Sequence, residues 1–128
     1  MHVHSNLKPT IVILGAGPAG LLRAIQSIGN GNPTTVIEKR SEDATARENT
    51  VALTTTTIAM LKYCGIYQYL TENGLIYPPN RGDYISVRLG DLEKAMKEVL
   101  NQISPNSRIL YDTTVIEITS QTGDCSLA

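Results

Sequence analysis

The first forty residues alternate between short apolar runs and one amphipathic segment, and this pattern predicts a strand-helix-strand unit. Thr10 to Leu14 is a β-branched, apolar run that ends at a glycine, as in a fully buried strand of a parallel sheet. From Pro18 to Ile28 apolar side chains recur at helical spacing, with a proline in the first turn, where its missing N–H costs nothing. Thr34 to Ile37 is a second buried strand. This unit predicts an α/β fold with a right-handed crossover.

The pattern after residue 40 is weaker. Thr50 to Tyr63 is predicted as a helix, although its four consecutive threonines are β-branched and lower the helix propensity. Tyr67 to Leu75 fits a short helical turn, and Tyr77 to Tyr84, with two prolines and a glycine, fits a loop. Gly90 to Ile103 has a continuous apolar face and acidic residues near its start, which together predict a long helix.

Two further strands are predicted near the end of the sequence. Arg108 to Tyr111 is the first, and we expect no other strand between Ile37 and this run. Thr113 to Thr119 alternates between its two faces and is the second, followed by a turn at Gln121 to Asp124. A hairpin's return strand would then be starting where the sequence stops.

Composition narrows the class of protein. The chain has 128 residues, of which 41% are hydrophobic and 18% charged, with a net charge of −1, as in an ordinary soluble globular domain. This balance argues against a nucleic-acid binder, and no stretch approaches the roughly 18 apolar residues of a membrane span. A cytoplasmic location is therefore expected. Cys64 and Cys125, and likewise His2 and His4, lack the spacing and acidic partners of a metal site, so no metal is predicted.

The chemical signal lies in the turn after the first strand. Three glycines there form a GxGxxG motif, whose residues are Gly15, Ala16, Gly17, Pro18, Ala19 and Gly20. The first glycine permits the tight turn, the second leaves room for a pyrophosphate, and the third lets the helix pack closely on the sheet. The amide groups at the start of that helix favour phosphates. The motif alone is weak evidence, but its position between a strand and a helix is that of a dinucleotide-binding site.

Glu38 completes the dinucleotide-binding pattern. It ends the second strand, eighteen positions beyond Gly20, where a carboxylate accepts hydrogen bonds from both hydroxyls of an adenosine ribose. Its charge would repel a 2′-phosphate, so an unphosphorylated adenosine is expected. The motif serves both FAD and NAD. In a domain that binds only a nicotinamide cofactor, the third strand comes soon after the second. Here a long insertion separates the second strand from Arg108. Such an insertion suits a domain whose extra elements wrap over an extended cofactor.

Four segments resemble one family. They are Ile13 to Gly20, Val36 to Arg40, Arg47 with Asn49, and Ile85 to Arg88 with Leu92. Together they resemble the N-terminal FAD-binding region of aromatic-hydroxylase-type flavoprotein monooxygenases, with the MICAL monooxygenase domain as the nearest relative suggested. The resemblance implies a three-layer, Rossmann-like α/β domain with a parallel sheet, which stops at the start of a β-meander.

The resemblance also implies roles for basic residues. Arg47 and Arg88 would contact the FAD phosphates or ribityl chain, although each could also be a solvated charge, and Arg88 could bridge to acidic residues of its own helix. Lys39 and Arg40 are expected on the surface, with Lys39 near the adenine. NAD(P)H would reduce the flavin of the parent enzyme.

The sequence departs from the family in length. The later flavin-binding segments and the substrate domain are absent, so residues 1–128 are expected to be a single, partial FAD/NAD(P)-binding domain that binds FAD weakly and is inactive alone. No catalytic residue is predicted. Two alternatives stay open: an NAD-binding module, or a non-catalytic nucleotide-binding or protein-interaction domain that self-associates through an unpaired sheet edge.

Overall fold

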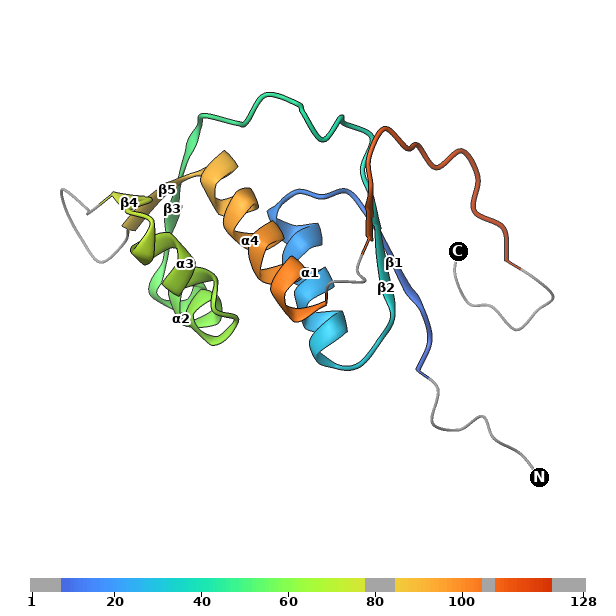
Figure 1. Cartoon of the computed structure of the whole chain (residues 1–128), viewed down its shortest axis with the longest axis horizontal. Coiled ribbons are helices and arrows are strands. Elements are labelled where there is room, and N and C mark those ends of the chain that lie inside the picture. Colours follow the sequence, from blue (N-terminus) through green and yellow to red (C-terminus); the bar gives the residue numbers. More distant parts are fainter. Residues whose placement is uncertain (1–7, 78–84, 105–107, 121–128) are drawn as a thin grey trace.

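The computed structural model describes residues 8–77, 85–104 and 108–120 (Figure 1). Its helices and strands follow one another along the chain as β1 (Ile11–Leu14), α1 (Pro18–Gly29), β2 (Thr34–Ile37), β3 (Thr50–Leu53), α2 (Thr55–Tyr63), α3 (Ile66–Glu72), β4 (Ile76–Tyr77), β5 (Ile85–Arg88), α4 (Leu89–Ile103) and β6 (Arg108–Leu110). The predicted α/β fold with a parallel sheet is therefore confirmed.

The parallel sheet has the order β1-β2-β6, with β2 in the centre. Ile13 pairs with Val36, which in turn pairs with Ile109, so these three side chains share one face of the sheet. Helix α1 packs on this face against β1 and β2, because Leu21, Ala24 and Ile25 form its apolar stripe. The carboxyl ends of β1 and β2 meet at one edge, where the glycine turn begins.

A second, antiparallel sheet has the order β3-β5-β4. In Figure 1 the helices α1 and α4 lie between the two sheets, which gives three layers, and α2 and α3 lie beside the second sheet. Helix α4 contacts α1, α3 and β5, so it joins the two halves of the fold. The core combines buried residues of both halves: Ala16, Leu21, Ala24, Ile25, Val36, Leu53, Leu61, Ile66, Leu70, Val87, Leu92, Ala95, Met96, Val99 and Leu100.

The prediction of one helix over Thr50 to Tyr63 is wrong in its first part. Residues Thr50–Leu53 form β3, in which Val51 pairs with Val87 of β5, and the helix begins at Thr55. Thr54 ends the strand and caps the helix, since its hydroxyl accepts a hydrogen bond from the Thr57 N–H. The β-branched residues that weaken a helix are suited to a strand, and a partner in β5 decides the outcome.

Two expectations about strands are also wrong. Strands β3, β4 and β5 come before Arg108, because they pair with one another in a sheet of their own. Residues 113–119 form no strand, and no described strand forms a ladder with them. Their alternation is therefore unsupported, and Ile116 is 96% exposed. Tyr67 to Leu75 was predicted as a helical turn, and α3 occupies most of it. The predicted loop beyond Tyr77 and the turn at 121–124 lie outside the described residues.

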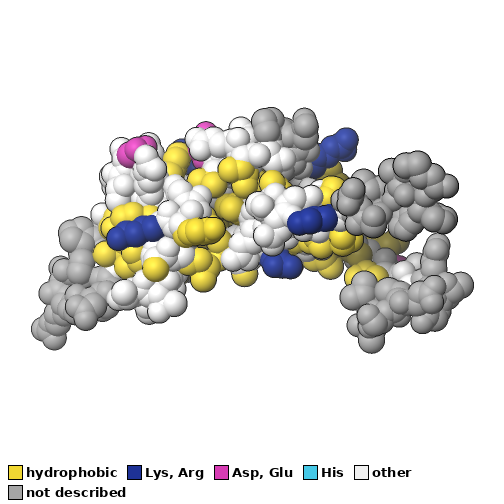
Figure 2. Space-filling model, turned by 90° about the horizontal axis from the view of Figure 1, so that it is seen from below, with side chains coloured by type: hydrophobic (Ala, Val, Ile, Leu, Met, Phe, Trp, Pro, Cys, Tyr) yellow, Lys and Arg dark blue, Asp and Glu magenta, His cyan; other side chains and the backbone are white. Residues whose placement is uncertain are grey.

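Hydrophobic side chains reach the surface at several places. Figure 2 views the molecule of Figure 1 from below and shows hydrophobic side chains at many places on this face, between separate Lys and Arg side chains. Met60, Tyr63 and Ile103 are exposed and line a groove of about 610 Å³ between the ends of α1, α2 and α4. Val12 and Leu14, on the face of the parallel sheet opposite α1, are each 55% exposed.

Candidate functional site

The glycine turn connects β1 to α1, and its conformation requires glycine at two positions. The Gly15 N–H donates to the Ile37 carbonyl at 2.7 Å, and its φ of +105° lies in the region that side chains disfavour. At Gly20 an added Cβ would lie 2.0 Å from the Gly15 carbonyl oxygen. The absence of a side chain at Gly20 therefore allows α1 to start directly against the strand.

The N-terminus of α1 is open. Gly17 is the N-cap residue with an extended backbone, Pro18 is the first helical residue, and no side chain of the described residues caps this end. A Cβ added to Gly17 would meet no described atom within 4 Å, so there is free space beside it. Ala16 is fully buried, whereas Ala19 is exposed. The first-turn amides, which have no partner within the helix, are available to an anion.

Glu38 lies beside this turn and is 6% exposed. One carboxylate oxygen accepts a hydrogen bond from the Ala16 N–H at 2.9 Å, and the other accepts one from the Arg40 N–H at 2.8 Å. The Arg40 amide, assisted by the Ala16 amide and the Arg40 charge, holds the pKa of Glu38 below its usual value against the opposing effect of burial. A carboxylate has about four acceptor positions, so two remain for other donors.

A pocket of about 420 Å³ opens at the carboxyl ends of β1 and β2. We call it the glycine-turn pocket, and its lining residues are Leu14, Gly15, Gly17, Ile37, Glu38, Lys39, Arg40, Arg47, Thr113, Thr114 and Val115. It thus brings together five of the residues that the sequence singles out, two from the glycine turn and three from beyond β2. The hydrogen bonds from Thr113 N–H to the Glu38 carbonyl and from Asp112 N–H to the Arg40 carbonyl hold the segment after β6 at its rim.

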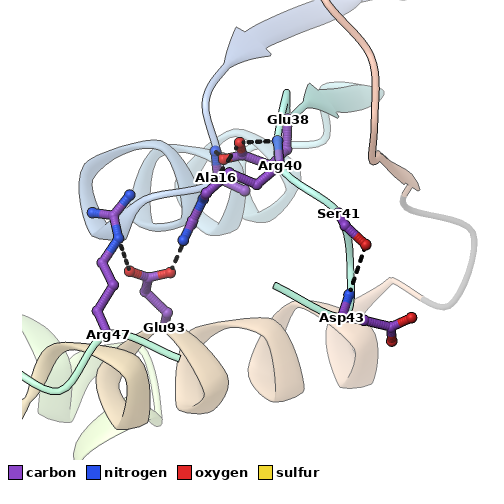
Figure 3. A network of polar contacts seen from close by, with 7 residues as sticks. All are labelled: Ala16, Glu38, Arg40, Ser41, Asp43, Arg47 and Glu93. Carbon is purple, nitrogen blue, oxygen red and sulfur yellow. Dashed lines mark hydrogen bonds and ion pairs between the residues drawn. The ribbon is translucent and has the colours of Figure 1, made fainter. Parts of the chain in front are cut away.

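Arg40 and Arg47 flank Glu93, a residue of α4 for which sequence reasoning predicted no role at the cofactor site (Figure 3). Arg40 Nη2 donates to Glu93 Oε2 at 3.2 Å, and Arg47 Nε lies 3.8 Å from Glu93 Oε1. Glu93 is 5% exposed. Arg40, expected on the surface, is instead partly buried, because its guanidinium lies between Glu38 and Glu93. The sequence offers only one weak signal for this arrangement, which is that Glu93 follows Leu92 on the apolar side of the predicted helix.

Backbone hydrogen bonds to the start of α4 hold Arg47 beside the glycine-turn pocket. The Gly90 N–H donates to the Arg47 carbonyl at 2.9 Å, and the Leu89 N–H donates to the Asn49 carbonyl at 2.8 Å. These bonds satisfy amides at the start of α4. A Cβ at Gly90 would lie 2.8 Å from the Arg47 carbonyl oxygen, so the close approach requires glycine.

Arg88 is placed differently from the other predicted residues. It is exposed, ends β5 and is the N-cap residue of α4, and it is not among the residues that line the glycine-turn pocket. The alternative for Arg88 is an ion pair with Asp91 or Glu93, and of these two Glu93 pairs with Arg40 and Arg47.

Other chemistry is sparse within the described residues. Burial raises the pKa of the Cys64 thiol, which disfavours the reactive thiolate. In the described part of the chain no group of three or more His, Cys, Asp and Glu side chains could hold a metal ion. Nor does any helix described there have the length and apolar character to cross a membrane. His2, His4 and Cys125 lie outside the described residues.

No protein-family model matches the chain, and no curated protein matches its sequence. Solved structures do match. The Diels-Alderase PyrE3 of pyrroindomycin biosynthesis aligns over 88% of this chain with a TM-score of 0.70 and 19% identity. Tetracycline destructase Tet(55) aligns over 92% with a TM-score of 0.73 and 17% identity. The flavin-dependent monooxygenase PieE, solved with FAD and substrate, aligns over 86% with a TM-score of 0.64 and 15% identity.

These similarities concern the fold. The aligned region is 27% of PyrE3, 33% of Tet(55) and 24% of PieE, so this chain spans a third or less of the length of each. Because the sequence identities are 19% or lower, the similarity shows only that the chain shares a mixed α/β architecture with these proteins, one of which is a flavin-dependent monooxygenase. One fold can support several reactions, and a Diels-Alderase among the neighbours illustrates this.

Proposed function

We propose that this chain binds the ADP portion of FAD at the glycine turn, as the FAD-binding part of a flavin-dependent oxidoreductase of the monooxygenase type. The observation that carries the proposal is the position of Glu38. Its buried carboxylate, with acceptor positions to spare, shares one pocket with the open N-terminus of α1.

Each part of an ADP group has a complementary part of this pocket. The diphosphate suits the first-turn amides of α1, with the free space at Gly17 admitting it and Arg47 adding positive charge. The ribose hydroxyls suit Glu38, and the adenine would lie toward Lys39, which is exposed at the end of β2. Ala19 and Gly20 offer backbone N–H groups, whereas Pro18, which has none, starts the helix. The family resemblance assigns Arg88 a contact with the phosphates or the ribityl chain of FAD, at the start of α4.

FAD is favoured over NAD by the sequence resemblance and by the similar fold of PieE, which was solved with FAD. When bound, FAD would supply the redox chemistry, and NAD(P)H would reduce it in the parent enzyme. This chain contributes binding and orientation of the ADP group and no catalytic residue. We expect it to be inactive alone and to hold FAD weakly, because the chain spans a third or less of the solved structures that it resembles while the ordering cost of the cofactor remains. We also propose, from the sequence resemblance, that the FAD-binding region is related to that of the MICAL monooxygenase domain.

The test is a comparison of ligands on the purified chain. Absorbance of the purified protein reports retained flavin, and calorimetric titrations with ADP, FAD and NAD report the affinities. We expect ADP and FAD to bind and Gly17→Ala to abolish both. Binding of NAD that is much tighter than that of FAD would support the nicotinamide alternative. If none of the three binds, the proposal is wrong, and a protein-interaction domain becomes the better reading of the fold.

A further inference from the structure

Arg40 stands between two carboxylates, and its contacts with them are unequal. Its Nη2 donates a hydrogen bond to Glu93 Oε2 at 3.2 Å, whereas its Nε lies 3.6 Å from Glu38 Oε2, beyond a hydrogen bond (Figure 3). Within the described residues the buried Arg40 Nε has no hydrogen-bond acceptor. The guanidinium is thus held by Glu93 while one of its donors faces Glu38.

Glu93 does not line the glycine-turn pocket, so it would act on a ligand there through another residue. It comes from the second turn of α4, is 5% exposed, and has an arginine at each of its oxygens. Both of these arginines do line the pocket. Glu93 lines an adjoining pocket of about 360 Å³ together with Glu38, Arg40 and Arg47, and Arg40 is the residue that contacts both carboxylates.

We propose that Glu93 is a positioning residue, which limits the Arg40 guanidinium to an ion pair with Glu38 at 3.6 Å, short of a hydrogen bond, and so keeps the remaining acceptor positions of the Glu38 carboxylate open to ribose hydroxyls. The inference rests on the proposed function, because it assumes that Glu38 accepts those hydroxyls. It adds a residue of α4, 53 positions from Arg40, to the determinants of ribose recognition.

The physical reason is competition for the same lone pairs. A guanidinium has five N–H donors in a planar fork and pairs readily with a carboxylate through two parallel hydrogen bonds. Glu38 Oε2 already receives the Arg40 backbone N–H. If the Arg40 fork turned onto Glu38 as well, the charge-assisted bonds would fill the positions that a neutral hydroxyl would use. Glu93 prevents this by offering a second carboxylate.

The experiment compares ADP with 2′-deoxy-ADP by calorimetry, because their ratio of dissociation constants reports the hydroxyl that Glu38 accepts. We expect the full chain to favour ADP by about tenfold, the size of one hydrogen bond to a charged group. In Glu93→Gln the preference should fall below about threefold, since Arg40 is released onto Glu38. In Glu93→Gln combined with Arg40→Met, where no guanidinium can compete, the tenfold preference should return.

Two further variants separate positioning from charge and from folding. Glu98→Gln removes the same charge from an exposed position of α4 and should leave the preference unchanged. Glu93→Asp keeps the charge but is one methylene shorter, so it should lose part of the preference, and it serves if the glutamine variant does not fold. A full preference in both Glu93 variants would overturn the inference and leave the proposed function standing. Absence of ADP binding by the unmodified chain would overturn both.

Discussion

At the scale of single residues, Gly17 and Gly20 look alike in sequence but have opposite surroundings. An added Cβ at Gly20 would lie 2.0 Å from a backbone oxygen, whereas one at Gly17 would meet no described atom. We expect Gly20→Ala to lower the free energy of unfolding by about 1–3 kcal/mol, as overpacking does. Gly17→Ala, at an N-cap with free space beside it, should cost less than about 1 kcal/mol, yet abolish ADP binding. Urea unfolding and ADP titration of both variants test this contrast, and equal stability losses would contradict it.

Glu38 should also make the stability of the fold depend on pH. Its folded pKa lies below the ordinary value of 4.5, so its ionised form stabilises the fold above that pH, and this contribution is lost as the pH falls through the folded pKa. Glu38→Gln should therefore lower the free energy of unfolding at neutral pH, by about 1–3 kcal/mol if one amide loses its acceptor. Unfolding curves at a series of pH values should show the difference shrinking below pH 4.5. Glu98→Gln, at an exposed position of α4, is the matched control, and an equal loss of stability there would contradict the role of Glu38.

The residues that sequence reasoning located are those whose surroundings are local. Glu38 and the glycines belong to one strand-helix-strand unit, in which short connections and parallel pairing leave little freedom. Arg40 was misjudged because its partner, Glu93, is 53 positions away, and spacing carries no information about such a pair. Arg47 depends in the same way on α4, whose first turn binds its carbonyl.

At the scale of elements, the segment before β3 is held on the start of α4. The Gly90 N–H and the Leu89 N–H each bind a carbonyl of this segment, and an added Cβ at Gly90 would approach Ala46 Cβ to 3.0 Å. We predict that Gly90→Ala pushes the segment outward and lowers the free energy of unfolding by about 1–3 kcal/mol. Because Arg47 would move with its backbone, ADP affinity should fall as well. Lys94→Ala, at an exposed position of the same helix, is the matched control; if it has the same effect, close packing is not the cause.

The elements show where local pattern is insufficient. Helix α4 was predicted almost to its ends, because its apolar side chains recur over four turns. Strands β3 and β5 have four residues each, and their pairing of Val51 with Val87 joins a segment that was predicted as helix to one for which no element was predicted. Short strands carry too few residues for a clear period, so a distant partner defines them.

At the scale of the whole molecule, the parallel sheet has two unlike faces. Ile13 packs against the core under α1, while Val12, its neighbour in β1, is 55% exposed on the other face. We predict that Ile13→Thr lowers the free energy of unfolding by about 2–4 kcal/mol, because it removes buried apolar surface and buries a hydroxyl. Val12→Thr conserves the branched shape, so its cost should stay within about 0.5 kcal/mol. It should also reduce the fluorescence of a dye that binds exposed apolar surface. Urea unfolding of the Ile13→Thr and Val12→Thr variants tests this prediction. Equal losses in the free energy of unfolding would mean that both faces of the sheet are covered.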